Sequence, residues 1–523
     1  MRKIYLAFLI FIYHNLSAQN DIQINPNQSF CGESNLAVNP TNGNMVVAWM
    51  KLTAVTPIPI ISMAVSNSTD GGKTWSNPVY MPHYFKTGTS ADPTMAYNSS
   101  GELFLVYIDS KLAKDSGGVY ISKSSDDGKN WAAPNKLIDF NDGPDIPIDR
   151  PFIAIDKSNN IHKGRIYVTS KSYKDGQKPH HIWYTFSDNK GKTWNPPAVL
   201  DTLCIPIDPN SSTACYPAIN STGKFMVMYF SYNTKYNIYP RILVAESYDG
   251  INFTFNPALN LSAISAIPAT DSLLQPSMSF TTNPQDSNNY MICWADNRNN
   301  DLDIYSIYTS DGKNWSTPNR VNDDNISNGF HQDMCWSAVS PNGTFGIGWR
   351  DRRNNTKNQN SDYVIYCAVS TDKGKTFQSN IKINQISGSL MVPVDGNDFI
   401  GLEVSDSMLM STWADKRNGK NQLYYNSKKY ITNTAIANNF DINNGISIYP
   451  NPADEVINIY IKDNRSNYII EITDLLGQQV YKQSTSINLT PISTKSFAAK
   501  GAYLVKIFDK KGIEYYSSKI VVQ

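Results

Sequence analysis

Ser68-Thr-Asp70-Gly-Gly72-Lys-Thr-Trp75 is the stretch that decides the fold, because variants of it return five more times along the chain. The Asp position recurs after 56, 63, 60, 62 and 61 residues. A fixed period of about this size indicates stacked copies of one supersecondary unit. The six residues at the Asp position are Asp70, Asp126, Asn189, Asp249, Asp311 and Asp372.

Each copy reads as the turn of a β-hairpin. An alternating run such as Ile61-Ser-Met-Ala-Val65 precedes the string, and a proline-containing stretch with another short run follows it. This order predicts strand, tight turn, strand. In such a turn the Asp carboxylate accepts bonds from turn amides, the glycine supplies a positive φ, and the Trp or Phe covers the hairpin base. We therefore expect these six positions to be structural.

Two further series share the period, and both have seven members. One is an inner strand, as in Leu36-Ala-Val38, and the other is a strand that ends in an aromatic residue. The aromatic residues are Trp49, Tyr107, Tyr167, Tyr229, Trp294, Trp349 and Trp413. The seventh unit lacks the hairpin string, and Asp21-Ile-Gln-Ile-Asn25 matches the missing outer strand.

The count predicts an all-β fold, a seven-bladed β-propeller over residues 20–430 that an N-terminal strand closes. Closure would remove exposed strand edges. A β-helix or an open solenoid is the alternative, and it is disfavoured because units of about sixty residues with four strands have the size of propeller blades.

The repeated Ser-x-Asp-x-Gly-x-x-Trp strings resemble the Asp boxes, or BNR repeats, of the sialidase-like propeller superfamily. The resemblance covers most of residues 30–430. It implies that the boxes lie on the face opposite the active site, and that a ligand of this protein is a glycan or glycoconjugate. Known sialidases have six blades, whereas the count here is seven, so the resemblance alone does not predict sialidase activity.

The two ends of the chain predict export. Residues 1–18 have a positive start and an apolar run from Leu6 to Tyr13, which is typical of a signal peptide and too short to span a bilayer. Residues 431–445 are polar and rich in Asn, as in a linker. Residues 446–523 resemble the type IX secretion C-terminal sorting domain of Bacteroidota, a small β-sandwich. The matching strings are Tyr449-Pro-Asn-Pro452, Asp474-Leu-Leu-Gly477 and Gly501-Ala-Tyr-Leu-Val-Lys506.

That resemblance implies the type IX secretion machinery as a partner and a secreted or outer-surface location. An ordinary carbohydrate-binding sandwich is the alternative for this module. The net charge is +1 and only 17% of residues are charged, so no basic stripe indicates nucleic acid. No segment predicts a transmembrane span.

The cysteines and acidic loops give weaker signals. Cys204 and Cys215 flank a proline-containing loop and are the pair most suited to a disulfide, whereas Cys31, Cys293, Cys335 and Cys367 have no predicted partner. We expect no cofactor and no metal. Calcium at the Asp-rich loop from Asp139 to Asp149 is an open alternative, although such loops are more often plain turns.

Chemistry is expected on the face away from the boxes, at the residue before each inner strand. These residues are Glu33, Asp92, Arg150, Tyr216, Gln275, Asp333 and Asn397, with His331 beside Asp333. We single out Tyr216, Glu33 and Asp92 as catalytic candidates and Arg150, His331 and Asp333 as ligand-binding candidates. In sialidases, which the boxes resemble, a Tyr acts as nucleophile, a Glu activates it, an Asp is the acid/base, and three Arg hold the substrate carboxylate. The family's Arg-Ile-Pro string is absent, which argues against true sialidase activity.

A second ring follows the aromatic strand ends, beginning with Asp109. The string Trp-x-Asp-x-Arg occurs three times in it, which adds Asp296, Arg298, Asp351, Arg353, Asp415 and Arg417 as ligand-binding candidates. Arginine forks suit carboxylates and paired carboxylates suit acid/base work. The alternative is that each Asp–Arg pair pins a loop to the neighbouring blade, and threefold repetition favours that structural role.

Overall fold

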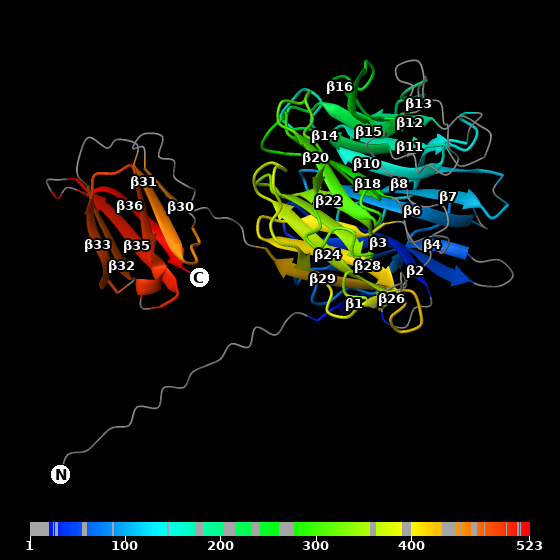
Figure 1. Cartoon of the computed structure of the whole chain (residues 1–523). Helices are drawn as coiled ribbons and strands as arrows, with labels where there is room; N and C mark the ends of the chain where they lie inside the picture. Colours follow the sequence, from blue (N-terminus) through cyan, green and yellow to red (C-terminus); the bar gives the residue numbers. More distant parts are fainter. Residues whose placement is uncertain are drawn as a thin grey trace, which may run out of the picture. The chain divides into compact units, whose positions relative to one another are not determined.

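The computed structural model describes residues 20–24, 26, 30–54, 60–85, 88–113, 115–143, 146–172, 181–202, 215–231, 241–260, 277–355, 362–389, 399–430, 446–449, 451–461, 468–474, 476–497, 499–509, 512 and 514–522. The chain divides into two compact units, Met1–Tyr430 and Ile431–Gln523 (Figure 1). The expected signal peptide and linker lie outside the described residues.

Within its described residues, unit 1 consists of seven antiparallel sheets that follow one another along the chain. The first two sheets are β2 (Cys31–Val38), β3 (Met45–Ala54), β4 (Ile60–Ser68), β5 (Val79–Tyr80) and β6 (Gly88–Tyr97), β7 (Leu103–Lys111), β8 (Gly117–Ser124), β9 (Asn135–Asp139). The next two are β10 (Asp149–Ile155), β11 (Ile166–Lys171), β12 (Ile182–Ser187), β13 (Ala198–Val199) and β14 (Cys215–Ile219), β15 (Phe225–Ser231), β16 (Arg241–Ser247), β17 (Thr254–Asn260).

The fifth sheet is β18 (Met278–Thr282), β19 (Tyr290–Asp296), β20 (Asp303–Thr309) and β21 (Asn319–Arg320). The sixth is β22 (Gln332–Val339), β23 (Phe345–Asp351), β24 (Asp362–Ser370) and β25 (Ile381–Lys382), with β26 (Gly388–Ser389) also paired to β24. The seventh is β27 (Gly401–Val404), β28 (Met408–Asp415) and β29 (Gln422–Lys429), and its outer strand is β1 (Ile22–Ile24) from the other end of the unit.

The first strand of each sheet is its innermost strand. These strands contact one another in chain order from β2 through β6, β10, β14, β18 and β22 to β27, and β2 also contacts β27. Each inner strand begins at one end of the unit and runs toward the end where the boxes lie, because strands pair antiparallel with their neighbours. The unit therefore has a strand-start face and a box face.

The boxes form the turns between the third and fourth strands, as their residue types require. In the first box, Ser68 Oγ accepts from the Gly72 amide at 2.9 Å, and Asp70 Oδ1 accepts from the Thr74 amide at 3.0 Å. Gly72 has φ of 83°, and its carbonyl accepts from Trp75 Nε1 at 3.1 Å. Backbone and hydroxyl donors are satisfied locally, so the motif stabilises the turn.

Box loops also join neighbouring sheets. Asp127, in the second box loop, accepts from Asn39 Nδ2 at 2.6 Å and Asn44 Nδ2 at 2.8 Å, both in the turn after the first inner strand. The first box docks on the seventh sheet, where the Trp75 and Tyr425 rings lie 5.4 Å apart. Each box therefore helps to fix the next sheet against the one before it.

Unit 2 is a small sandwich of two sheets. One contains β30 (Ile446–Tyr449), β31 (Val456–Ile461) and β34 (Leu489–Ser493), and the other β33 (Gln479–Thr485), β32 (Tyr468–Asp474), β35 (Gly501–Phe508) and β36 (Glu514–Val522). Alternate residues face one shared core in which isoleucine predominates, including Ile457, Ile459 and Ile470 at 0% exposure.

Candidate functional site

Backbone bulges at the strand-start face mark the candidate site. Glu33 in β2, Asp92 in β6 and Arg150 in β10 have φ of 42°, 55° and 46°, and Met334 in β22 has 53°. Each lies where the register between the first and second strand shifts. Left-handed φ is costly for a residue with a side chain, and bulges of this kind re-aim side chains at functional sites.

The bulges bring the first three of these side chains together, as the sequence predicted for Glu33, Asp92 and Arg150. Asp92 and Glu33 share a side-chain hydrogen bond, and Asp92 Oδ2 accepts from the Arg150 amide at 3.0 Å. Burial raises the pKa of Asp92, and the Asp149 carboxylate raises it further, while the Glu33 hydrogen bond and the Arg150 charge act against this rise. Two carboxyls in contact cannot both ionise easily, so the pair holds a proton.

Asp149 and Lys171 also belong to this cluster; the sequence pointed to Asp149 only as part of a calcium loop, and Lys171 was missed. Lys171 Nζ lies 2.9 Å from Asp149 Oδ2, and the lysine side chain is only 2% exposed. The two residues face each other in the register of β10 and β11. The signal that could have found them is their place directly before the Arg150 bulge and at the end of the facing strand.

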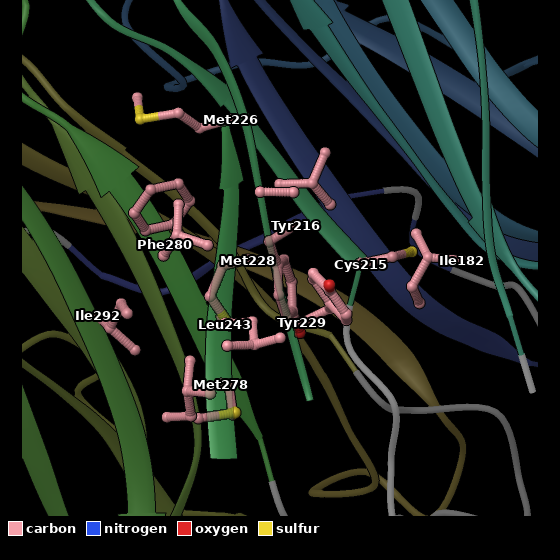
Figure 2. Packing of buried hydrophobic residues seen from close by; sticks show 14 of the residues in the cluster. Ile182, Cys215, Tyr216, Met226, Met228, Tyr229, Leu243, Met278, Phe280 and Ile292 are labelled. Carbon is pink, nitrogen blue, oxygen red and sulfur yellow. The ribbon is translucent and has the colours of Figure 1, made fainter. Parts of the chain in front are cut away.

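Tyr216 lies in an aromatic layer next to this cluster, and the layer forms part of the lining of a cavity on the other face. Its ring centroid is 4.7 Å from that of Phe152 and 5.8 Å from that of Trp336, and Arg150 lies over Phe399 at 5.8 Å. The surrounding apolar cluster, part of which Figure 2 shows, leaves Tyr216 8% exposed. Burial raises the pKa of its hydroxyl, against a positive Arg150 that lowers it. An activated nucleophile needs the opposite shift.

A cavity of about 820 Å³ lies on the other side of the aromatic layer. Later residues of the inner strands and the turns after them line it, so it belongs to the box face. Lys157 and Glu403 are the charged residues among its described lining. Burial lowers the pKa of Lys157 and raises that of Glu403 to about 7, while the opposite charge of each acts against the shift in the other.

The three Trp-x-Asp-x-Arg strings form one repeated unit inside their sheets. Asp296 is 0% exposed and accepts from Trp294 Nε1 at 2.8 Å and from Arg298 Nη2 at 2.7 Å. Arg298 also stacks on Tyr305, with its Cζ 4.2 Å from the ring centroid. The same Trp, Asp, Arg and Tyr contacts recur around Asp351 with Arg353 and around Asp415 with Arg417.

These contacts favour the structural alternative for all six residues. Arg417 additionally bonds Asp21 of the N-terminal segment at 2.6 Å, and Arg353 bonds Asp323 beyond β21. These two pairs therefore hold a strand end against the adjoining outer segment.

Asp333 and His331 also have structural surroundings. Asp333 is fully buried and accepts from Arg350 Nε and Arg352 Nη1, both at 2.9 Å. Although burial alone would raise it, these two guanidinium groups hold the pKa of Asp333 at about 2. His331 Nδ1 accepts from the Leu302 amide at 2.9 Å.

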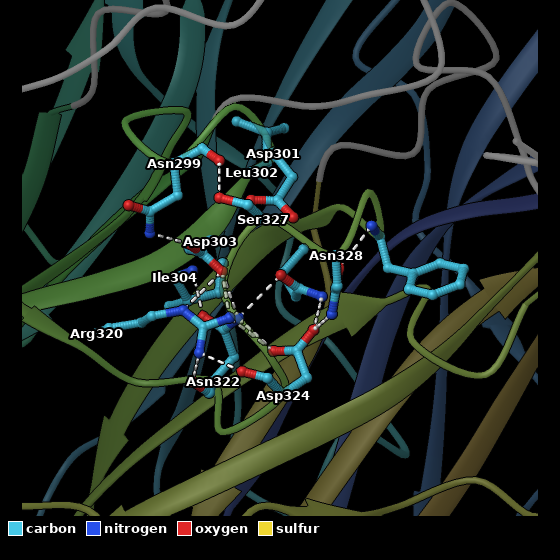
Figure 3. A network of polar contacts seen from close by, with 12 residues as sticks. Asn299, Asp301, Leu302, Asp303, Ile304, Arg320, Asn322, Asp324, Ser327 and Asn328 are labelled. Carbon is cyan, nitrogen blue, oxygen red and sulfur yellow. Dashed lines mark hydrogen bonds and ion pairs between the residues drawn. The ribbon is translucent and has the colours of Figure 1, made fainter. Parts of the chain in front are cut away.

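A polar network beside them is largely satisfied by its own members, with Asp301 Oδ1 as a buried exception (Figure 3). Asp303 accepts from Arg320 Nε at 2.8 Å and Asn322 Nδ2 at 2.7 Å. Asp324 accepts from the same Asn322 amide at 2.7 Å and from Asn328 Nδ2 at 2.7 Å. The Arg320 guanidinium thus lies among these carboxylates, at the place where a metal cation would otherwise bind.

Two of the predicted residues before the inner strands, Gln275 and Asn397, lie outside the described residues. Cys215 is a buried free thiol whose Sγ donates to the Arg150 carbonyl at 3.4 Å, so the disulfide expected with Cys204 is not present, and Cys204 itself lies outside the described residues. No group of three or more His, Cys, Asp or Glu side chains in the described ranges is arranged to hold a metal ion. Among the same residues, no helix has the length and apolarity to cross a membrane.

Comparisons with known proteins agree with the two-unit architecture. Residues 43–279 match the BNR repeat-like domain, and residues 447–523 match the secretion system C-terminal sorting domain. Both resemblances drawn from the sequence are thereby confirmed. The chain therefore has a BNR repeat-like region followed by a secretion system C-terminal sorting domain.

Solved structures with similar folds are distant. A protein of unknown function from Dyadobacter fermentans DSM 18053 is 14% identical, with 79% of this chain and 98% of that chain covered and a TM-score of 0.44. The GH93 alpha-L-arabinofuranosidase of Fusarium graminearum with arabinobiose is 12% identical, with 79% and 98% covered and a TM-score of 0.43. The Hadza microbial sialidase Hz136 is 13% identical, with 71% and 73% covered and a TM-score of 0.41. These similarities assign no activity. A comparison with curated proteins found no match.

Proposed function

We propose that this exported protein binds a glycan at the strand-start face and hydrolyses a glycosidic bond there, with the Glu33–Asp92 pair as the acid. The observation that carries the proposal is the hydrogen-bonded carboxyl pair at two consecutive strained bulges, next to Arg150 at a third. A carboxyl whose pKa is raised by burial, as that of Asp92 is, is suited to protonate a leaving-group oxygen.

The pair acts as one acid because its carboxyls touch. Glycosidases place their two carboxylates about 5–9.5 Å apart, on either side of the bond that breaks, so two hydrogen-bonded carboxyls cannot supply both roles. Asp149 is the second carboxylate, since it interacts electrostatically with Asp92 and its side chain is 19% exposed. Arg150 orients the substrate and stabilises charge beside the pair.

The charge of the cluster supports an uncharged glycan. Three acidic side chains, Glu33, Asp92 and Asp149, face two cations, Arg150 and Lys171, and Lys171 already pairs with Asp149. The arginines of the Trp-x-Asp-x-Arg units are bound to their own carboxylates. The cluster therefore has no excess of positive charge for a substrate carboxylate, and we expect no sialidase activity.

We further propose that the seven sheets are the blades of one closed ring over residues 20–430. The contact of β2 with both β6 and β27 and the pairing of β1 with β29 support it. A signal peptide over residues 1–18 and type IX secretion through residues 446–523, after the linker 431–445, would deliver the protein to the cell surface or the medium. The sorting-domain match supports this route.

A non-catalytic glycan-binding platform is the second candidate. The ion pair between Asp149 and Lys171 favours it, because that pair engages the carboxylate that hydrolysis requires. The two candidates make different predictions for the same variants.

The test is a panel of neutral plant oligosaccharides and sialylated glycans, assayed for binding by calorimetry and for products by chromatography. If the protein is a hydrolase, the wild type releases product from a neutral glycan. The Asp92→Asn and Glu33→Gln variants then lose product formation but still bind the glycan. Binding without product in the wild type supports the platform. No binding and no product across the panel would reject both. Asp115→Ala, at an exposed surface ion pair, is the matched control.

A further inference from the structure

A second set of reactive side chains lies between the first two sheets, outside the cluster described above. Ser62 is in β4, His83 follows β5, and Asp109 is in β7. We propose that Ser62, His83 and Asp109 form a nucleophilic site that hydrolyses esters of short carboxylic acids. This activity is independent of glycoside hydrolysis.

The atoms of the three side chains are in the order that this chemistry needs. Ser62 Oγ is 2.9 Å from His83 Nε2, and His83 Nδ1 is 2.8 Å from Asp109 Oδ1. A carboxylate only accepts hydrogen bonds, so Nδ1 carries the proton and Nε2 accepts from the serine hydroxyl. This is the arrangement in which a histidine takes the serine proton while a buried aspartate fixes its tautomer.

Asp109 is held rigidly in that position. It is 0% exposed, its Oδ2 accepts from the Tyr84 amide at 2.7 Å, and its Oδ1 also accepts from Ser90 Oγ at 2.9 Å. Asp109 begins the second ring expected from the sequence, but no Trp-x-Asp-x-Arg unit surrounds it. The equivalent carboxylate binds an arginine in three other sheets, and it binds a histidine here.

Gly88 makes room for the contact between the histidine and the aspartate. A Cβ at this position would lie 3.1 Å from His83 Cβ and Nδ1 and 3.2 Å from Asp109 Oδ1. Distances this short would push the imidazole away from the carboxylate. The space that glycine leaves therefore positions the ring.

The surroundings define the substrate class. Ser62 is 6% exposed, and its Oγ lies 3.3 Å from the hydroxyl of Thr53, which is exposed. The nucleophile is thus one side chain beneath the surface, which admits a small acyl group such as acetyl. Tyr84, next to the histidine, is 54% exposed and offers an aromatic surface to a larger alcohol part.

The reaction balances with water as the co-substrate. Ser62 Oγ forms a bond to the acyl carbon as the ester C–O bond breaks, and the serine proton passes through His83 Nε2 to the departing alcohol. Water then attacks the acyl-serine, gives its proton to His83, and releases the carboxylic acid with the serine restored. Asp109 stabilises the transient imidazolium.

The test uses the full chain with p-nitrophenyl acetate as substrate and a fluorophosphonate as covalent probe. We expect turnover and one probe adduct, located on Ser62 by peptide mass spectrometry. Ser62→Ala should lose both. His83→Gln and Asp109→Asn should lower turnover by about 10²–10⁴-fold. Gly88→Ala should lower turnover as well.

Ser66→Ala is the matched control, because Ser66 lies on the same strand and its Oγ donates to the Ser76 carbonyl at 2.6 Å. It should keep the adduct and the turnover. Tryptophan fluorescence checks that each variant is folded. The proposal is overturned if the folded wild type forms no adduct at Ser62, or if turnover survives Ser62→Ala. Adduct formation and turnover in the wild type still test the proposal even if a variant fails to fold.

Discussion

Replacing Asp333 by alanine should destabilise unit 1 strongly. The change leaves the Arg350 and Arg352 guanidinium groups, which are 0% and 1% exposed, without the carboxylate that accepts four of their hydrogen bonds. Removing one partner of a buried ion pair costs about 3–5 kcal/mol, because the remaining charge stays out of water. Two stranded cations place this variant at the upper end of that range.

The assay is equilibrium unfolding in urea followed by tryptophan fluorescence. All ten tryptophans lie between Trp49 and Trp413, so the signal reports on unit 1 and not on the sorting domain. Asp115→Ala removes one side of an exposed pair with Lys111, at 3.8 Å, and should cost less than about 1 kcal/mol. A loss below about 1 kcal/mol in Asp333→Ala, matching the control, would refute the reasoning.

Three further outcomes are expected. The pKa of Glu403 is raised to about 7 from an ordinary 4.5, so its contribution to the free energy of unfolding is full below pH 4.5 and is lost as the pH rises through 7. Glu403→Gln should therefore reduce the difference in stability between pH 5 and pH 8, measured by urea unfolding. Tyr425→Ala should lower the free energy of unfolding by about 3–5 kcal/mol, because the ring is 1% exposed and packs against Trp75 of the first box. A smaller loss in thermal unfolding would mean that this contact contributes little to stability. Asp70→Asn should leave the unfolding midpoint unchanged at pH 7, since Asn189 in the third box accepts the equivalent Thr193 amide at 2.9 Å; a clear shift would show that the charge itself matters.

The fold was largely predictable because its signals are local. A box needs a hydroxyl, a carboxylate or amide, and a glycine within five residues, so Ser68, Asp70 and Gly72 reveal the turn wherever the string occurs. Strand patterns between the boxes then determine the sheets. The sorting domain was recognisable for the same reason.

The candidate site was predictable in part. Glu33, Asp92 and Arg150 were found because each precedes the apolar run that predicted an inner strand; the strands begin earlier than predicted and include these residues, and the structure brings them together. The bulges that re-aim them depend on backbone geometry that no residue type announces. Tyr216 satisfies the same positional rule, but packing against Phe152 and Trp336 from other sheets buries it, and contacts across sheets have no signature in a single strand.

The Ser62–His83–Asp109 set illustrates the same limit. Its members come from two sheets and an intervening loop, and neither Ser62 nor His83 is a residue type that recurs at its place in the repeat. Only Asp109 had a periodic position. A distance of 2.9 Å between a serine oxygen and an imidazole nitrogen is a property of the folded chain alone.

The pairing of β1 with β29 governs when folding can finish. Asp21 accepts from Asn426 Nδ2 at 2.8 Å, although the two residues are 405 positions apart. Closing so long a loop is entropically costly, so we expect this pairing to form after the local hairpins. Among the described strands, none from beyond Lys429 pairs into the sheets of unit 1. A protease that removed the sorting domain after export would leave the β1–β29 pairing and every described strand of unit 1 in place.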